Sequence, residues 1–138
     1  MFSDLDGSLL DHYSYSFQEA LPAITALEQH NIPLILASSK TRCEILELRE
    51  ALGNEHPFIV ENGAAIFIPQ HYFPSQPAHT EAHGAYWVHE MAPPRDQWLT
   101  LLATLQQEFP ADFNSFHQAG VTGIMDMTGL SEAQATQA

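Results

Sequence analysis

Short apolar runs alternate with longer stretches of helical periodicity along the first half of the chain. The predicted strands lie at 1–4, 33–37 and 58–60, and the predicted helices between them at 16–30 and 41–53. The unbroken run at 33–37 is typical of a strand that is buried on both faces of a parallel sheet. Pro22 favours a helix start near Ala20, because proline is tolerated only in the first turn. This order predicts an α/β fold with right-handed crossovers.

The second half of the chain has weaker patterns. Asn62-Gly63 between two apolar runs predicts a β-hairpin. The polar stretch 69–84 predicts a loop, and the segment 85–91 predicts a further strand. Helices are expected at 94–109 and at 113–127, although two glycines weaken the second pattern. A last helix is expected after Ser131, which would be its N-cap residue.

Two acidic residues, Asp4 and Asp6, stand at the end of the first predicted strand and are followed by Gly7 and Ser8. On an extended backbone, positions i and i+2 point to the same side, so both carboxylates face one pocket. Their mutual repulsion favours a bound divalent cation such as Mg²⁺. One Asp is then able to attack phosphorus while the other transfers a proton. The alternative interpretation is a solvated Asp-x-Asp-Gly turn.

Hydroxyl and ammonium groups follow the second predicted strand, in Ser38-Ser39-Lys40. This stretch is expected at the same sheet edge as Asp4 and Asp6, where α/β sheets bind their ligands. A capping-box pattern starts the next helix, whose N-terminus adds partial positive charge. Together these groups predict a phosphate site, and a plain serine-rich turn is the alternative.

Three stretches carry a resemblance to a known family. They are Asp4-Leu5-Asp6-Gly7-Ser8-Leu9-Leu10-Asp11, Ala37-Ser38-Ser39-Lys40-Thr41 and Pro57-Phe58-Ile59-Val60-Glu61-Asn62-Gly63-Ala64. The first resembles the opening motif of the haloacid dehalogenase (HAD) superfamily of phosphatases. The others, with 128–131, are similar to its mannosyl-3-phosphoglycerate phosphatase branch.

The resemblance implies a HAD-like (Rossmannoid) parallel-sheet core. Residues 1–82 would form its first half, and residues 83–138 part of an inserted α/β cap. It also implies roles for single residues: Asp4 as nucleophile, Asp6 as acid and base, Ser38 or else Ser39 with Lys40 on the phosphate, and Asn62 nearby. Mg²⁺ would be held by Asp4 and Asp6, and Asp6 would bind it through its backbone carbonyl.

The pattern departs from the family in one respect. The lysine of the third motif and the Gly-Asp-x-x-Asn-Asp pair of the fourth would lie beyond residue 138. Without them, the transition-state charge lacks its lysine and the Mg²⁺ lacks further carboxylates. We expect this chain alone to be feebly active or inactive, with an apolar sheet edge left open.

Charge indicates which classes of binding partner are disfavoured, and cysteine content indicates the cellular compartment. A net charge of −13 argues against nucleic acids and anionic membranes, although two of the four basic residues fall at Lys40 and Arg42. The single cysteine, Cys43, fits a reducing cytoplasm. The histidines of the 71–89 stretch match no compact zinc pattern, so solvated surface residues are the preferred interpretation.

The sequence therefore predicts a Mg²⁺-dependent phosphomonoester hydrolase that forms an aspartyl-phosphate. Its substrate would be a small phosphorylated sugar or glycerate, with mannosyl-3-phosphoglycerate preferred. Two alternatives stay open: a sucrose- or trehalose-phosphate type of phosphatase, and a non-catalytic domain that self-associates through its unfinished sheet.

Overall fold

The computed structural model describes residues 1–110 and 112–137. The chain divides into two compact units, Met1–Ala92 and Pro93–Ala138. The predicted border after residue 82 falls within a strand of the first unit. Residues 111 and 138 of the predicted cap lie outside the described residues, and its role as a cap stays a prediction. In the described ranges, no helix has the length and apolar character needed to cross a bilayer.

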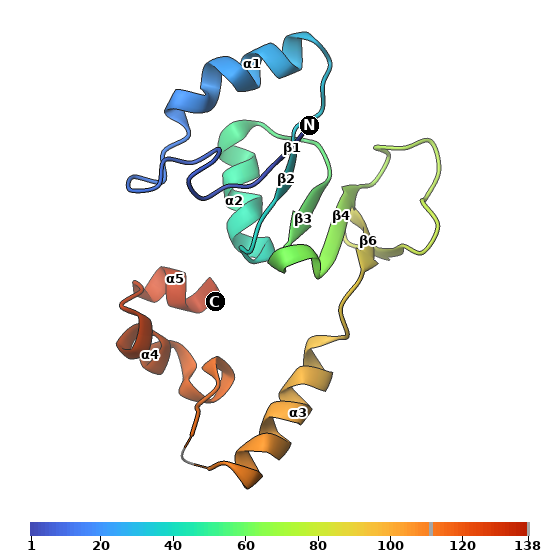
Figure 1. The fold of residues 1–138 in the computed structure, drawn as a ribbon. Helices are drawn as coiled ribbons and strands as arrows, with labels where there is room; N and C mark the ends of the chain where they lie inside the picture. Colours follow the sequence, from blue (N-terminus) through green and yellow to red (C-terminus); the bar gives the residue numbers. More distant parts are fainter. Residues whose placement is uncertain (111, 138) are drawn as a thin grey trace. The chain divides into compact units, whose positions relative to one another are not determined.

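Six strands form one mixed sheet in the first unit. Most of them are labelled in Figure 1. Their spatial order is β1 (Phe2–Ser3), β2 (Ile35–Ala37), β3 (Phe58–Val60), β4 (Ala65–Pro69), β6 (Tyr86–Glu90) and β5 (Glu81–His83). The first three strands are parallel, and the other pairings are antiparallel. The predicted α/β class is confirmed.

Two helices connect the parallel strands. A short 3-10 turn, Gln18–Ala20, leads into α1 (Leu21–Gln29), so Pro22 lies in the first turn and the later predicted start is confirmed. The second helix, α2 (Arg42–Leu52), begins with the predicted capping box. The Thr41 amide donates to a Glu44 carboxylate oxygen at 2.8 Å, and the Glu44 amide donates to the Thr41 hydroxyl at 3.5 Å. Gly53 ends α2 in the left-handed conformation.

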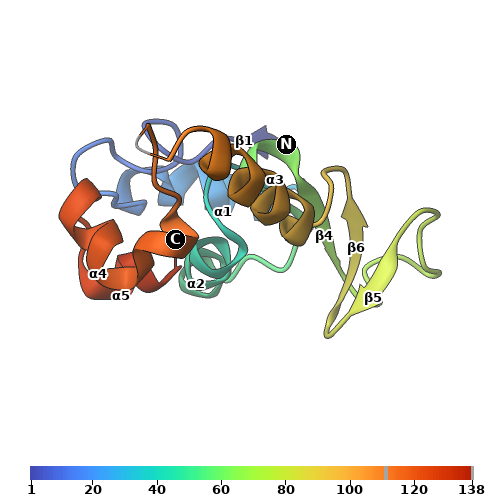
Figure 2. The same cartoon turned by 90° about the horizontal axis from the view of Figure 1, so that it is seen from below.

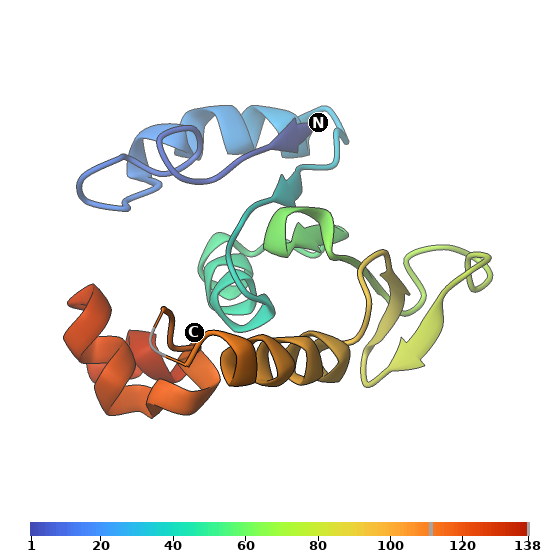
Figure 3. The same ribbon diagram turned by 60° about the horizontal axis from the view of Figure 1, so that its bottom comes forward.

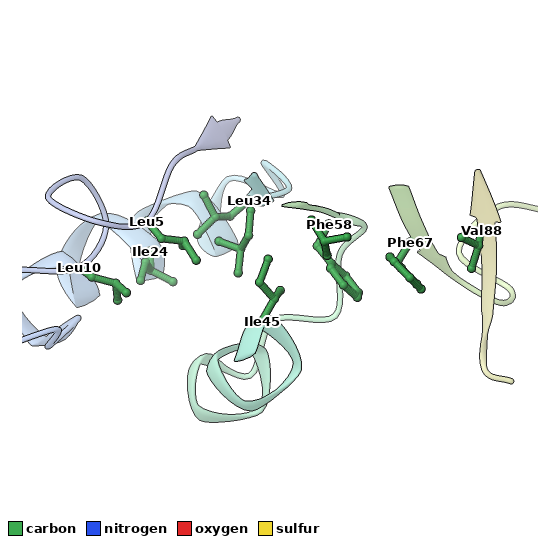
Figure 4. Packing of buried hydrophobic residues seen from close by; sticks show 10 residues of the cluster. Leu5, Leu10, Ile24, Leu34, Ile45, Phe58, Phe67 and Val88 are labelled. Atoms are coloured by element: carbon green, nitrogen blue, oxygen red, sulfur yellow. The ribbon is translucent and has the colours of Figure 1, made fainter. Parts of the chain in front are cut away.

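Both helices cover the same face of the sheet. Ile24 of α1 and Ile45 of α2 belong to one buried cluster with Leu36 and Phe58 (Figure 4). Successive right-handed crossovers that run in one direction across a sheet bring their helices to one face. Within β2, Leu36 is fully buried whereas its two neighbours are only half-buried. The prediction that 33–37 is buried on both faces is therefore wrong for this strand.

The β4–β6 region contains one strand that the sequence did not predict. The hairpin between β3 and β4 is confirmed, and β6 matches the predicted strand at 85–91. The predicted loop at 69–84, however, contains β5, which pairs with β6 (Figure 2). All three residues of β5 are exposed, so no alternation of apolar and polar positions marked it.

The described residues of the second unit are mainly helical, and their course can be followed in Figure 3. The helices are α3 (Arg95–Glu108), α4 (Phe116–Thr128) and α5 (Glu132–Gln137). Gly120 interrupts α4 with a φ of 62°, consistent with the weak pattern there. The Ser131 hydroxyl accepts from the Gln134 amide at 3.4 Å, so the predicted cap is confirmed.

Candidate active site

The register of β1 against β2 determines where the candidate catalytic residues lie. The two strands run parallel, and their last pair in register is Ser3 with Leu36. Asp4 therefore leaves β1 at the same edge at which Ser38 leaves β2, the carboxyl edge of the parallel strands. This is the edge at which α/β sheets bind their ligands. The expected common edge of the two motifs is present.

Asp6 and Lys40 are brought into direct contact across that edge. The Lys40 ammonium lies 3.1 Å from a carboxylate oxygen of Asp6, with the two side chains 20% and 39% exposed. The ammonium also lies 5.4 Å from the centre of the Tyr15 ring. A partly exposed pair of this kind adds little to stability, but it holds a positive charge beside the acidic motif.

Ser38 is the buried member of the predicted phosphate group. The residue is 6% exposed, whereas Ser39 is exposed. The Ser38 hydroxyl oxygen accepts from the Lys40 amide at 3.2 Å, and the Ser38 amide donates to Ile59 of β3 at 3.2 Å. These two hydrogen bonds, both made by Ser38, hold the loop that follows β2 in place.

Asn62 joins this loop through its backbone. The Asn62 amide donates to the Ser38 carbonyl at 3.0 Å, and the Glu61 amide donates to the Lys40 carbonyl at 3.1 Å. Both residues have a left-handed φ, 56° for Asn62 and 50° for Glu61, in the 3-10 turn Glu61–Gly63. Such angles persist where the surroundings hold them, and here two hydrogen bonds do so. The Asn62 residue is exposed.

The segment after the acidic motif folds back on itself. Gly7 has a φ of 72°, and its amide donates to the Leu10 carbonyl at 3.0 Å. Leu5 and Leu10 are buried on either side of this turn, whereas Asp4 and Asp6 are exposed. Leu5 therefore packs into the core, whereas the acids on either side of it lie away from the core.

Asp11 anchors the far end of this segment. One of its carboxylate oxygens accepts from the Ser14 amide at 2.8 Å, the Ser14 hydroxyl at 2.7 Å and the Tyr13 amide at 3.1 Å. These bonds, led by that from the Ser14 amide, hold the pKa of Asp11 below its usual range.

Replacement of Ser14 by alanine is expected to raise the pKa of Asp11 toward its ordinary value, because the hydroxyl bond is lost and the two amide bonds remain. A depressed carboxyl pKa stabilises the folded state above the unfolded pKa, and this contribution disappears as the pH falls through the folded pKa. An NMR titration of the Asp11 carboxyl measures the shift. An unchanged pKa in Ser14→Ala would contradict the role of the hydroxyl.

Comparison with known proteins identifies the family to which this site belongs. The sequence profile of the haloacid dehalogenase-like hydrolases matches residues 1–83, which include both motifs. The chain belongs to this family. The haloacid dehalogenase-like fold is also seen in a solved hydrolase from B. subtilis, with a TM-score of 0.53 and 21% identity over 78% of this chain and 33% of that one.

Two curated relatives of this haloacid dehalogenase-like chain carry the same name, glucosyl-3-phosphoglycerate/mannosyl-3-phosphoglycerate phosphatase. The protein from Methanococcoides burtonii is 36% identical over 94% of this chain and 48% of its own length. The protein from Persephonella marina is 49% identical over 52% of this chain and 27% of its own length. The chain thus spans at most about half the length of these relatives.

The donor set for a cation in this family member is small. Among the described residues, no three His, Cys, Asp or Glu side chains gather closely enough to hold a metal ion. The exposed Asp4 carboxylate has the chemistry that Mg²⁺ prefers, and the Asp6 side chain is engaged by Lys40. The chemistry of the Asp4 side chain therefore fits one ligand position of a Mg²⁺ site.

Two features of the site were not predicted from the sequence. The ring of Tyr15 lies near Lys40, and the Lys40 ammonium lies against Asp6 rather than free for a ligand. Neither contact has a signal in the sequence, because each joins segments about 25 to 34 residues apart whose side-chain directions depend on the loop conformation.

Proposed function

We propose that this chain carries the first part of the active site of a phosphatase acting on mannosyl-3-phosphoglycerate or a related phosphorylated sugar. The observation that carries the proposal is the parallel β1–β2 pairing, which sets Asp4 and Asp6 at one edge with Ser38 and Lys40. The names of the two relatives support the substrate class.

Each residue has a proposed role in two steps. A carboxylate oxygen of Asp4 bonds to phosphorus as the bond to the leaving oxygen breaks, and Asp6 gives that oxygen a proton. Asp6 then takes a proton from water, whose oxygen bonds to phosphorus and releases Asp4 and inorganic phosphate. The buried Ser38 hydroxyl donates to the phosphoryl group throughout.

Lys40 links substrate binding to the state of Asp6. In the free chain its ammonium pairs with Asp6, which must be uncharged to act as an acid in the first step. A phosphate dianion competes with Asp6 for the ammonium, because it carries more charge and more acceptor oxygens. Binding of the phosphate therefore releases Asp6 for proton transfer.

Mg²⁺ is the proposed cofactor. When bound, it offsets the charge between the phosphate and the acidic residues and helps to orient the phosphoryl group. Asp4 and the backbone carbonyl of Asp6 are the proposed ligands from this chain. With so few ligands here, we propose that the chain by itself is weakly active or inactive. We also propose a cytoplasmic location, which the single cysteine supports.

Phosphate release tests the proposal. The purified chain is incubated with mannosyl- and glucosyl-3-phosphoglycerate, and in parallel with sucrose phosphate and trehalose phosphate. Slow release that needs Mg²⁺, stops with EDTA and favours the phosphoglycerates is the expected result. Equal turnover of all four compounds would count against a phosphoglycerate substrate, and faster turnover of sucrose or trehalose phosphate would favour that alternative.

A second candidate function rests on the open side of the sheet. Among the described residues, β1 is an edge strand whose one pairing partner is β2, and Phe2 on it is 70% exposed. Unpaired strand edges with exposed apolar side chains favour association with another chain. Light scattering that shows oligomers, together with no Mg²⁺-dependent phosphate release, would favour this association function over catalysis.

A further inference from the structure

A hollow lies at the opposite end of the parallel strands from the candidate active site. Its volume is about 910 Å³, and its lining comes from the end of α2, the segment 53–56 before β3, and the segments 69–72 and 85–86. These residues flank the amino end of β3 and the carboxyl end of the antiparallel β4. All of them belong to the first compact unit.

Arg49 is the buried charge in this hollow. Its side chain projects from α2, and the residue is only 6% exposed. One guanidinium nitrogen donates to the Tyr86 hydroxyl at 3.1 Å and the other to the His56 carbonyl at 2.8 Å. The guanidinium carbon lies 4.4 Å from the centre of the Phe58 ring. The third nitrogen, Nε, is buried and has no hydrogen-bond partner in the part of the chain that the structure describes.

None of these contacts neutralises the positive charge. Within residues 1–110 and 112–137, no carboxylate lies within ion-pair distance of Arg49. Glu50 and Glu55 line the same hollow, but both are exposed and their charges are screened by water. A buried cation without a counter-charge is costly, so the fold retains a strong preference for an anion here.

Further donors surround the guanidinium. A ring nitrogen of His56 lies 3.0 Å from the Tyr72 hydroxyl, and His71 lines the hollow beside them with an exposed side chain. Tyrosine hydroxyls and imidazoles both bind carboxylate and phosphate oxygens. The aromatic rings of Tyr72 and Tyr86 also offer apolar surface to the body of a small organic molecule.

We propose that this hollow binds a small molecule through an oxyanion, a carboxylate or a phosphate, with Arg49 as the charged group and His56, His71 and Tyr72 as further donors. This site is separate from the proposed phosphatase site, because its lining includes none of Asp4, Asp6, Ser38 or Lys40.

The site can be tested by following backbone amide chemical shifts while a probe is titrated into the protein. The two probes are inorganic phosphate and acetate, each added at constant ionic strength with sodium chloride as the reference. Saturable shifts in the segments 53–56, 70–72 and 85–86 are expected with at least one probe. Saturation with phosphate alone or acetate alone identifies the preferred oxyanion. Shifts that match those with chloride for both probes would overturn the proposal.

Variants distinguish probe binding in this hollow from binding at the proposed phosphatase site. His71→Asn keeps the left-handed backbone at this exposed position, and we expect it to weaken the saturable binding several-fold. Arg49→Lys is expected to weaken it at least about tenfold, the effect of losing a charge-assisted hydrogen bond. Lys40→Gln, in the proposed phosphatase site, should leave the binding that is reported by the segments 53–56, 70–72 and 85–86 unchanged. Unchanged binding in both His71→Asn and folded Arg49→Lys would overturn the site.

The pKa of His56 provides a readout that packing alone would not move. Burial, and then the charge of Arg49, lower this pKa; the N-terminal amine also lowers it, while Glu28 and Glu55 raise it. An oxyanion beside Arg49 opposes the effect of that charge, so saturating probe should raise the pKa of His56. A pKa that stays the same in the presence of a saturating probe would place the anion elsewhere.

Discussion

Replacement of Asp4 by asparagine is expected to lower the slow phosphate release of this chain to the uncatalysed background, because an amide oxygen does not form a stable phosphoryl intermediate. The change preserves the size of the side chain, and Asp4 is exposed, so the fold should be retained. The experiment measures single-turnover phosphate release with Mg²⁺, and circular dichroism checks the fold.

A second readout avoids dependence on turnover. Beryllium fluoride with Mg²⁺ binds to aspartate carboxylates as a mimic of the aspartyl-phosphate, and fluorine NMR detects the bound form. A bound signal is expected for the native chain and none for Asp4→Asn. The matched control is Asp11→Asn, an exposed carboxylate in the same segment whose contacts are with Ser14 and Tyr13. A signal that survives in Asp4→Asn but not in Asp11→Asn would exclude Asp4 as the nucleophile.

Replacement of Phe58 by alanine is expected to lower the free energy of unfolding by about 3–5 kcal/mol. Phe58 is fully buried and stacks on Phe67 with ring centres 5.2 Å apart, and the Tyr86 ring meets it edge-on at 5.6 Å. Its removal leaves a cavity in the cluster that joins α1, α2 and the sheet, and it also removes the ring beneath Arg49.

Urea unfolding followed by tryptophan fluorescence and circular dichroism measures this loss. Phe73→Ala is the matched control, because Phe73 is 45% exposed and lies outside the buried cluster. That variant should change the free energy of unfolding by less than about 1 kcal/mol. A similar loss in both variants would mean that the buried cluster is not the main source of stability.

The elements that the sequence predicted well are those whose signal is local. The capping box at Thr41 and the proline at position 22 set helix starts through neighbouring residues, and both were found where expected. The common edge of the Asp motif and Ser38 also followed, because the direction of parallel strands fixes it.

The features that escaped prediction depend on partners distant in sequence. Arg49 lies on the buried face of α2 although a charged residue there suggests solvent. It is accommodated by Phe58 and by the Tyr86 hydroxyl, which is 37 residues away. The strand β5 forms because β6 offers a pairing edge, and the ion pair of Lys40 with Asp6 needs both loops in their final conformation.

The turn at Glu61–Gly63 has a consequence for ligand binding. Because its amides hold the Ser38 and Lys40 carbonyls, the segment that would receive a phosphate is ordered by main-chain bonds before any ligand arrives. Affinity is then not reduced by the entropy of arranging that segment. The side chains of residues 61 and 62 can therefore differ without loosening the segment 38–40, provided that the backbone keeps its left-handed turn.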